Sequence, residues 1–243
     1  MQSINLRQQL KLIKILPNFL TILNGLCGCF AIVCIFNELS FLNSGYQAAL
    51  IFVLLGAVLD FLDGYLAKLL DAKSKLGVQL DSMSDLITFS LAPSLLIYDF
   101  LQNISADFKF TPFFAFLILI FSMIRLARFN TLPTKSYFLG LPTPANGIFF
   151  MGIPFISFYI DPIIIIITII VSSLLLVSNV KFESFKKDYT KADKVYFYIL
   201  FFLLILSALI CLFIYQIDIF NFISLAVLIY VFSSLLFNFY KSF

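Results

Sequence analysis

Long apolar segments, separated by short polar ones, dominate the pattern of hydrophobic and polar positions in this chain. From Pro17 onward they recur at close to the length that crosses a hydrocarbon layer, about 20 residues. Their approximate bounds are 17–36, 47–70, 80–101, 110–130, 143–160, 162–180, 195–216 and 218–239. The pattern predicts an all-α polytopic membrane protein with about eight transmembrane helices.

The first 16 residues follow a different pattern. Arg7, Lys11 and Lys14 recur at helical spacing, whereas leucine and isoleucine occupy another face of the same helix. This arrangement predicts an amphipathic helix over residues 1–16 that lies on an anionic membrane surface. A full-length span follows without a small-residue cleavage site, so we expect no signal peptide.

The basic residues predict the orientation of the chain. With the N-terminus in the cytoplasm, 15 of the 16 Lys and Arg residues fall in cytoplasmic segments, and Lys109 alone lies outside. The positive-inside rule therefore predicts a multi-pass protein of the cytoplasmic (inner) membrane with a cytoplasmic N-terminus. The loop 181–194 carries five of these lysines, and we expect them to contact anionic lipid headgroups.

Composition narrows the chemistry that this chain can perform. The 243 residues are 62% hydrophobic and 12% charged, which excludes a soluble domain and gives no reason to expect a nucleic-acid partner. The chain contains no histidine, the commonest general base. Any catalysis must therefore depend on carboxylates, lysine, tyrosine or cysteine.

Four aspartates interrupt helices that are otherwise apolar. Asp60 and Asp63 are three residues apart, and Asp81 and Asp85 are four apart, so each pair lies on one face of its helix. An ionisable group within a membrane costs about 2.5–3.5 kcal/mol on insertion scales and is therefore a functional candidate. The connection between the two helices is short, so we expect antiparallel neighbours that bring all four carboxylates together on the cytoplasmic side.

Like charges at such close range require compensation, and one or two hard divalent cations would supply it. Helix caps or solvated helix ends are an alternative interpretation, which accounts for Asp71 but not for two pairs in helical register among 13 acidic residues. An ion-coupled transporter is a second alternative, because intramembrane carboxylates often mark transport pathways. The sequence lacks the repeated halves that are typical of many transporters.

A second polar cluster closes the fourth predicted span. Arg125 and Arg128 are three residues apart and can point the same way, and Asn130 follows them. These arginines either balance charge and anchor the topology, or they bind an anionic group, since the guanidinium fork matches carboxylate and phosphate. Gly140 and Pro142 predict a rigid entry into the next span.

The spacing of the acids resembles the signature of the CDP-alcohol phosphatidyltransferase family, Asp-Gly-x₂-Ala-Arg-x₈-Gly-x₃-Asp-x₃-Asp, with a further Asp three residues earlier. The matching positions are Asp60, Asp63, Gly64, Ala67, Gly77, Asp81 and Asp85. Lys68 stands where the family has arginine. The segment Arg-x-Ala-Arg-Phe-Asn, followed by Phe-x-Gly-Leu-Pro-x-Pro-Ala, resembles the phosphatidylserine synthase branch of the family.

This resemblance implies transfer of the phosphatidyl group from CDP-diacylglycerol to L-serine, giving phosphatidylserine and CMP. Glycerol 3-phosphate or an inositol phosphate is the alternative acceptor within the family. The resemblance also implies two Mg²⁺ or Mn²⁺ ions, with Asp85 as general base. The implied metal ligands are Asp60, Asp63, Asp81 and Asp85. The implied CDP- and phosphate-binding residues are Asn18, Thr21, Gly64, Ala67, Lys68 and Gly77. The candidates for binding serine are Arg125, Arg128 and Asn130.

The resemblance covers roughly residues 17–180, which we expect to form a six-span core with its active site on the cytoplasmic side. A basic cytoplasmic loop, 181–194, follows this core. Residues 195–243 are interpreted as two additional spans that serve as scaffold or as the surface of a homodimer.

Overall fold

The computed structural model describes residues 15–37, 44–72, 74–104, 109–131, 138–156 and 161–182, together with residues 202, 206, 226 and 229. The predicted amphipathic helix, nearly all of the loop 181–194 and nearly all of the two C-terminal spans lie outside the described residues. The described part is helical apart from the strands β1 (Phe138–Leu139) and β2 (Lys181–Phe182), which pair antiparallel. The prediction of an all-helical membrane protein is confirmed for this part.

Among the described residues, four helices are long and apolar enough to cross a membrane. They are α2 (Leu16–Phe36), α3 (Gly45–Leu69), the continuous helix Lys75–Ile104 and the helix Thr111–Thr131. The third comprises α4 (Lys75–Leu86), the π turn η1 (Ile87–Leu91) and α5 (Ala92–Ile104). The fourth comprises the 3-10 turn η2 (Thr111–Ala115) and α6 (Phe116–Thr131). These helices correspond to the first four predicted spans.

The next two helices are shorter than the predicted spans 143–160 and 162–180. They are α7 (Thr143–Ile156), with 14 residues, and α8 (Pro162–Val177), with 16. The start of α8 follows from its sequence, because the Asp161 side chain accepts a hydrogen bond from the Ile163 amide at 2.9 Å. Pro162 suits this first position, where an amide hydrogen would have no helical partner.

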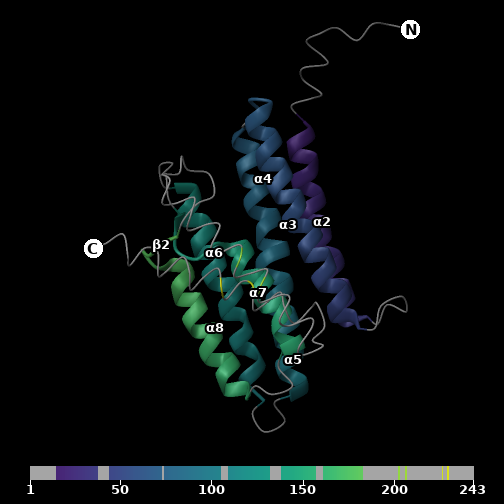
Figure 1. The fold of residues 1–243 in the computed structure, drawn as a ribbon, viewed down its shortest axis with the longest axis vertical. Coiled ribbons are helices and arrows are strands. Elements are labelled where there is room, and N and C mark those ends of the chain that lie inside the picture. Colours follow the sequence, from purple (N-terminus) through teal and green to yellow (C-terminus); the bar gives the residue numbers. More distant parts are fainter. Residues whose placement is uncertain are drawn as a thin grey trace, which may run out of the picture.

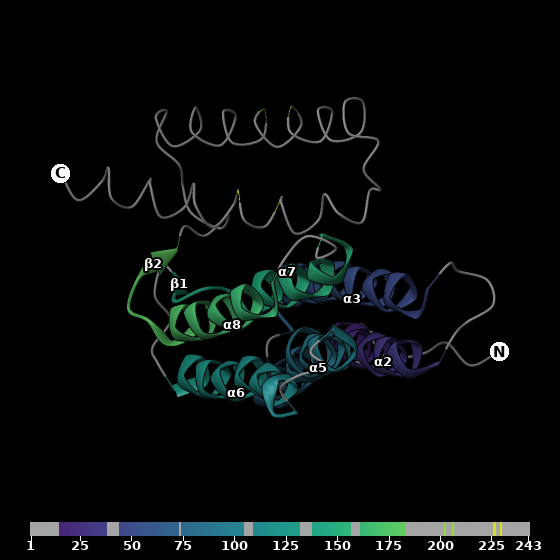
Figure 2. The same cartoon turned by 90° about the horizontal axis from the view of Figure 1, so that it is seen from below.

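The helices form two rows when the molecule is seen from below (Figure 2). One row contains α8, α7 and α3, and the other contains α6, α5 and α2. Contacts between α6 and α8, α5 and α7, and α2 and α3 join the rows. In Figure 1, α4 lies toward the same end of the molecule as the start of α2. This end carries the acidic residues.

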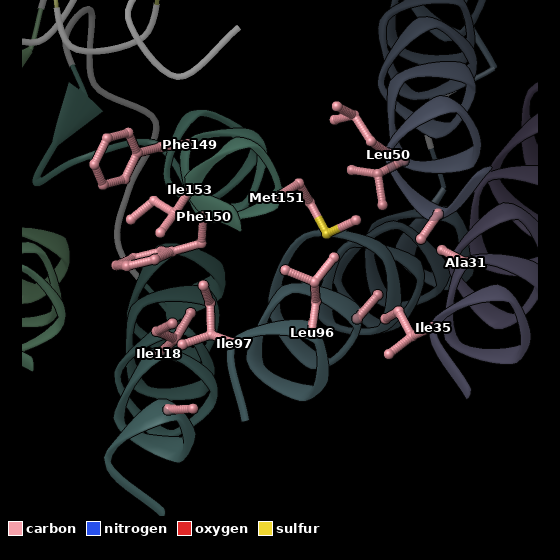
Figure 3. Packing of buried hydrophobic residues seen from close by; sticks show 14 of the residues in the cluster. Ala31, Ile35, Leu50, Leu96, Ile97, Ile118, Phe149, Phe150, Met151 and Ile153 are labelled. Atoms are coloured by element: carbon pink, nitrogen blue, oxygen red, sulfur yellow. The ribbon is translucent and has the colours of Figure 1, made fainter. Parts of the chain in front are cut away.

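The apolar core draws on α2, α3, α5, α6, α7 and α8, and α5 meets α7 within it (Figure 3). Leu96 and Ile97 of α5 face Phe150 and Met151 of α7, and all four side chains are fully buried. Lipid is as apolar as these side chains, so close van der Waals packing, not exclusion of water, stabilises helix contacts inside a membrane. The core therefore fixes the helix positions on which the polar end depends.

The π turn η1 directly follows the acidic segment and has a local cause. Pro93 lacks the amide hydrogen that an α-helix would direct to the Phe89 carbonyl. One residue earlier, the Ala92 amide bonds to the Ile87 carbonyl, five residues back. The sequence placed Pro93 inside a span but did not reveal this local change from α- to π-helical hydrogen bonding.

Two glycines allow neighbouring helices to approach this turn. A Cβ atom on Gly28 of α2 would lie 2.7 Å from Thr88 Cα, and a Cβ atom on Gly147 of α7 would overlap the Phe89 carbonyl oxygen. Side chains at either position would force the helices apart. The turn that follows Asp85 is thereby held between α2 and α7.

Candidate active site

Three aspartates meet at one end of the helix bundle. Asp60 and Asp63 of α3 and Asp81 of α4 each place a carboxylate oxygen within 4.8 Å of the others. Asp63 is buried, with 5% of its surface exposed, and the other two are half-buried. The structure thus brings together three of the four acids that the spacing predicted to meet.

Helix α2 connects the two acidic helices, because it packs along both α3 and α4. The Thr21 hydroxyl donates to Asp63 Oδ2 at 2.5 Å and also lies 3.0 Å from the Pro17 carbonyl oxygen. One turn earlier, Asn18 reaches α4, where a Cβ atom on Gly77 would lie 2.8 Å from Asn18 Oδ1. The predicted nucleotide-binding residues Asn18, Thr21 and Gly77 therefore lie against the acidic segments.

Asp85 lies one helical turn beyond Asp81 and outside the group of three carboxylates. It is close enough to Asp60 and Asp81 for their negative charges to act on it. Its Oδ1 atom accepts a hydrogen bond from Asn24 Nδ2 at 3.3 Å. Asn24 was not among the predicted site residues, although its position three residues after Thr21 places it on the same face of α2.

The remaining positions of the signature lie along the last turns of α3. Gly64 is exposed, and a Cβ atom there would meet no atom of the described residues within 4 Å. Ala67 is half-buried, and Lys68 is exposed in the last turn of the helix. This face of α3 is therefore open beside the acids.

The predicted serine-binding residues contact three different helices. The buried Arg125 donates from Nη1 to the Thr143 hydroxyl at the start of α7, at 2.7 Å. Asn130 of α6 and Ser82 of α4 are joined by two hydrogen bonds, at 2.9 and 3.3 Å. Ser82 directly follows Asp81 in the sequence. A cavity of about 200 Å³ between α4 and α6 is lined by Ser82, Asn130 and apolar side chains.

Arg128 makes its contacts at the far end of α8. Its Nη1 atom donates to the Val177 carbonyl at 2.8 Å, and Nη2 donates to Asn179 Oδ1 at 2.6 Å. The last carbonyls of a helix have no partner within the helix, so Arg128 caps α8. The spacing predicted that Arg125 and Arg128 can point the same way, whereas in the structure Arg125 bonds the start of α7 and Arg128 bonds the end of α8.

These features can be compared with known proteins. The family model described as CDP-alcohol phosphatidyltransferase matches residues 14–235. This chain belongs to the CDP-alcohol phosphatidyltransferase family. The resemblance inferred from the spacing of the aspartates is therefore confirmed, and the group of three carboxylates lies at this family's signature segment.

Curated relatives in this family share one name, CDP-diacylglycerol–serine O-phosphatidyltransferase. The Bacillus subtilis protein is 38% identical over 177 residues, which cover 71% of this chain and 92% of that protein. The Methanocaldococcus jannaschii protein is 31% identical over 185 residues, covering 76% of this chain and 78% of that protein. The Saccharomyces cerevisiae protein is 34% identical over 173 residues, covering 61% of each chain.

Proposed function

We propose that this protein transfers the phosphatidyl group of CDP-diacylglycerol to the hydroxyl of L-serine, giving phosphatidylserine and CMP. The observation that carries the proposal is the group formed by Asp60, Asp63 and Asp81, whose oxygens lie within 4.8 Å of one another. The names of the relatives support the choice of substrates. Phosphoryl transfer needs charge neutralisation and alignment more than covalent help, so a site without histidine suits it.

The three aspartates fit a divalent metal centre. They offer only oxygen donors, which Mg²⁺ and Mn²⁺ prefer, and their oxygens are close enough to share a cation. Asp63 is buried, where uncompensated negative charge is costly. Asp60, Asp63 and Asp81 would hold two such ions, and Asp85 lies beside this group without belonging to it. When bound, the ions supply the positive charge that neutralises the pyrophosphate and the leaving CMP phosphate.

Removal of divalent metal is expected to stop the reaction. Three carboxylates within 4.8 Å of one another repel a diphosphate unless cations intervene. Chelation with EDTA should lower CMP release by at least about 10³-fold, because the electrostatic contribution of a catalytic metal amounts to several kcal/mol. Excess Mg²⁺ or Mn²⁺ should restore the rate, and EDTA already saturated with Mg²⁺ is the control. Full turnover in metal-free buffer would contradict the metal centre.

Asp85 acts as the general base toward the serine hydroxyl. Asn24 donates to its Oδ1 atom, and no described residue donates to Oδ2, which can therefore accept the proton. The serine oxygen forms a bond to the phosphorus of the phosphatidyl group as that proton passes to Asp85. The bond from this phosphorus to the bridging oxygen breaks, and CMP leaves with the electron pair.

The nucleotide lies along the open face of α3. A Cβ atom on Gly64 would have no neighbour within 4 Å in the part of the chain that the structure describes, so this position leaves room for CDP. Lys68 contacts a phosphate as a point charge and cannot supply the bidentate fork of the family's arginine. Asn18 and Gly77 lie where α2 meets α4, and Thr21 bonds Asp63 of α3.

The acceptor binds toward α6. Arg125 pairs with the serine carboxylate through its planar guanidinium, which the Thr143 hydroxyl holds from the other side. Asn130, bonded to Ser82 next to Asp81, offers a polar group at the same end of the bundle. Arg128 is bonded to the Val177 carbonyl and to Asn179, so any contact with the acceptor would use its remaining N–H groups.

Serine is expected to be the preferred acceptor. With purified protein, CDP-diacylglycerol and equal acceptor concentrations, CMP release with L-serine should exceed that with glycerol 3-phosphate or inositol phosphate by at least about 100-fold. The physical reason is that a carboxylate and an ammonium group require different partners from a phosphate. A reaction without acceptor measures background hydrolysis. Faster release with either phosphorylated acceptor would reassign the substrate and leave the reaction type intact.

The site faces the cytoplasm in this proposal, and the distribution of basic residues supports that orientation. The diacyl tails remain in the lipid while CDP and serine arrive from the aqueous side. In this proposal the core comprises residues 17–180. The apolar pattern of 195–243, which lies almost entirely outside the described residues, predicts two further spans that would serve as scaffold or dimer surface.

A further inference from the structure

We propose that Asn24 positions Asp85 for proton transfer by holding Oδ1, so that Oδ2 stays available to the acceptor hydroxyl. The inference rests on the proposed function, in which Asp85 is the general base. Asn24 is fully buried in α2, and its Nδ2 atom donates to Asp85 Oδ1 at 3.3 Å. A hydrogen bond to one carboxylate oxygen restricts rotation of the whole carboxylate group.

A second bond ties Asn24 to the helix that carries Asp85. The hydroxyl of Thr88, one turn after Asp85, donates to the Asn24 main-chain carbonyl at 2.8 Å, and Thr88 is fully buried. The backbone and the side chain of Asn24 are thus both bonded to this helix. The two bonds fix the distance between α2 and the carboxylate.

The backbone of α3 closes the other side of the Asn24 amide. A Cβ atom on Gly56 would lie 2.8 Å from Asn24 Oδ1 and 2.7 Å from Thr88 Cγ2. Asn24 Oδ1 is buried and has no hydrogen-bond partner among the described residues, which is unfavourable. The reversed amide would place this oxygen against the Asp85 carboxylate, where the two would repel. The amide therefore has one favourable orientation, with its N–H groups toward Asp85.

The neighbouring turn of α2 shows the same arrangement. Thr21 donates to Asp63 of α3, and three residues later Asn24 donates to Asp85. If Thr21 and Asn24 served only to pack α2 against its neighbours, their hydrogen bonds would not need to end on a carboxylate in both α3 and α4. The geometry therefore favours a role in orienting the acids over helix packing alone.

The experiment compares Asn24→Ala with Asn37→Ala in the full-length protein, measuring kcat and KM from CMP release. Asn37 is exposed at the other end of α2, where its Nδ2 atom bonds the Val33 carbonyl. Loss of a hydrogen bond to a charged group should lower kcat about 10- to 100-fold in Asn24→Ala. The KM for CDP-diacylglycerol should stay within about twofold, and Asn37→Ala should match the wild type.

A double-mutant cycle separates positioning from a structural role. In an Asp85→Asn background, Asn24→Ala should change the residual rate less than about twofold, because the carboxylate that it orients is absent. An equal fold loss in both backgrounds would overturn the inference, as would an unchanged kcat in the single variant.

Thr88→Val and Thr88→Ser provide a second test that leaves Asn24 in place. The valine variant loses the hydroxyl bonded to the Asn24 carbonyl and should lower kcat about tenfold, whereas serine retains this bond and should retain the rate. Equal rates for the two variants would count against the inference. Serine-dependent CMP release by the wild-type protein tests the proposed function separately. The comparisons of the Asn24 and Thr88 variants can be made with whichever acceptor the wild-type protein uses.

Discussion

Asp63→Asn is expected to reduce serine-dependent CMP release by at least about 10³-fold, because it removes a charged ligand from the three-carboxylate group. Asparagine keeps the shape of the side chain and can still accept the Thr21 hydroxyl through its carbonyl, so the fold should persist. Residual activity should require a higher Mg²⁺ concentration for half-maximal rate. A metal titration of CMP release measures both effects.

The thermal stability of this variant provides an independent check. Three carboxylates within 4.8 Å of one another repel in metal-free protein, so Asp63→Asn should raise the metal-free Tm and weaken its increase on adding Mg²⁺. Asp71→Asn is the matched control, because Asp71 is exposed and its φ of 47° is one that asparagine adopts readily. Near-wild-type turnover by Asp63→Asn would remove this residue from the metal site.

Asp85→Asn is expected to lower kcat about 10²- to 10⁴-fold, the range typical of a lost general base. The asparagine carbonyl can still accept from Asn24, so the local packing should survive. Because Asp85 lies outside the group of three carboxylates, the Mg²⁺ concentration for half-maximal rate should change less than about threefold. Single-turnover CMP release at several Mg²⁺ concentrations measures the two quantities separately.

This result distinguishes the two roles proposed for Asp85. A large increase in the Mg²⁺ requirement, equal to that of Asp63→Asn, would identify Asp85 as a metal ligand and not as the base. A kcat within about twofold of the wild type would exclude both roles.

The acidic centre was largely predictable from the sequence. Helical periodicity put Asp60 and Asp63 on one face of α3, and the short connection to α4 placed Asp81 at the same end of the bundle. The structure brings these three carboxylates within 4.8 Å of one another. The short connection keeps the two acidic segments at one end of the bundle. The expectation that α3 and α4 pack directly against each other was wrong, because they make few direct contacts and α2 packs along both.

The partners of the polar residues were not predictable in the same way. Spacing indicated that Arg125 and Arg128 can point the same way, yet one bonds Thr143 of α7 and the other caps α8. Two side chains at i and i+3 diverge by about 60° around a helix, and this angle is enough for them to reach different neighbours. The way the helices pack determines which neighbouring helix each arginine contacts.

The membrane-spanning helices, the placement of the acids at one end and the family could all be inferred from the chain alone, because each follows from hydrophobicity or from spacing along single helices. That α2 contacts both acidic helices emerges only from how the helices pack. The hydrogen bond from Asn24 to Asp85 joins residues 61 positions apart. Such a contact exists only because Gly28 and Gly56 let three helix backbones approach closely, and no periodicity within one helix encodes that approach.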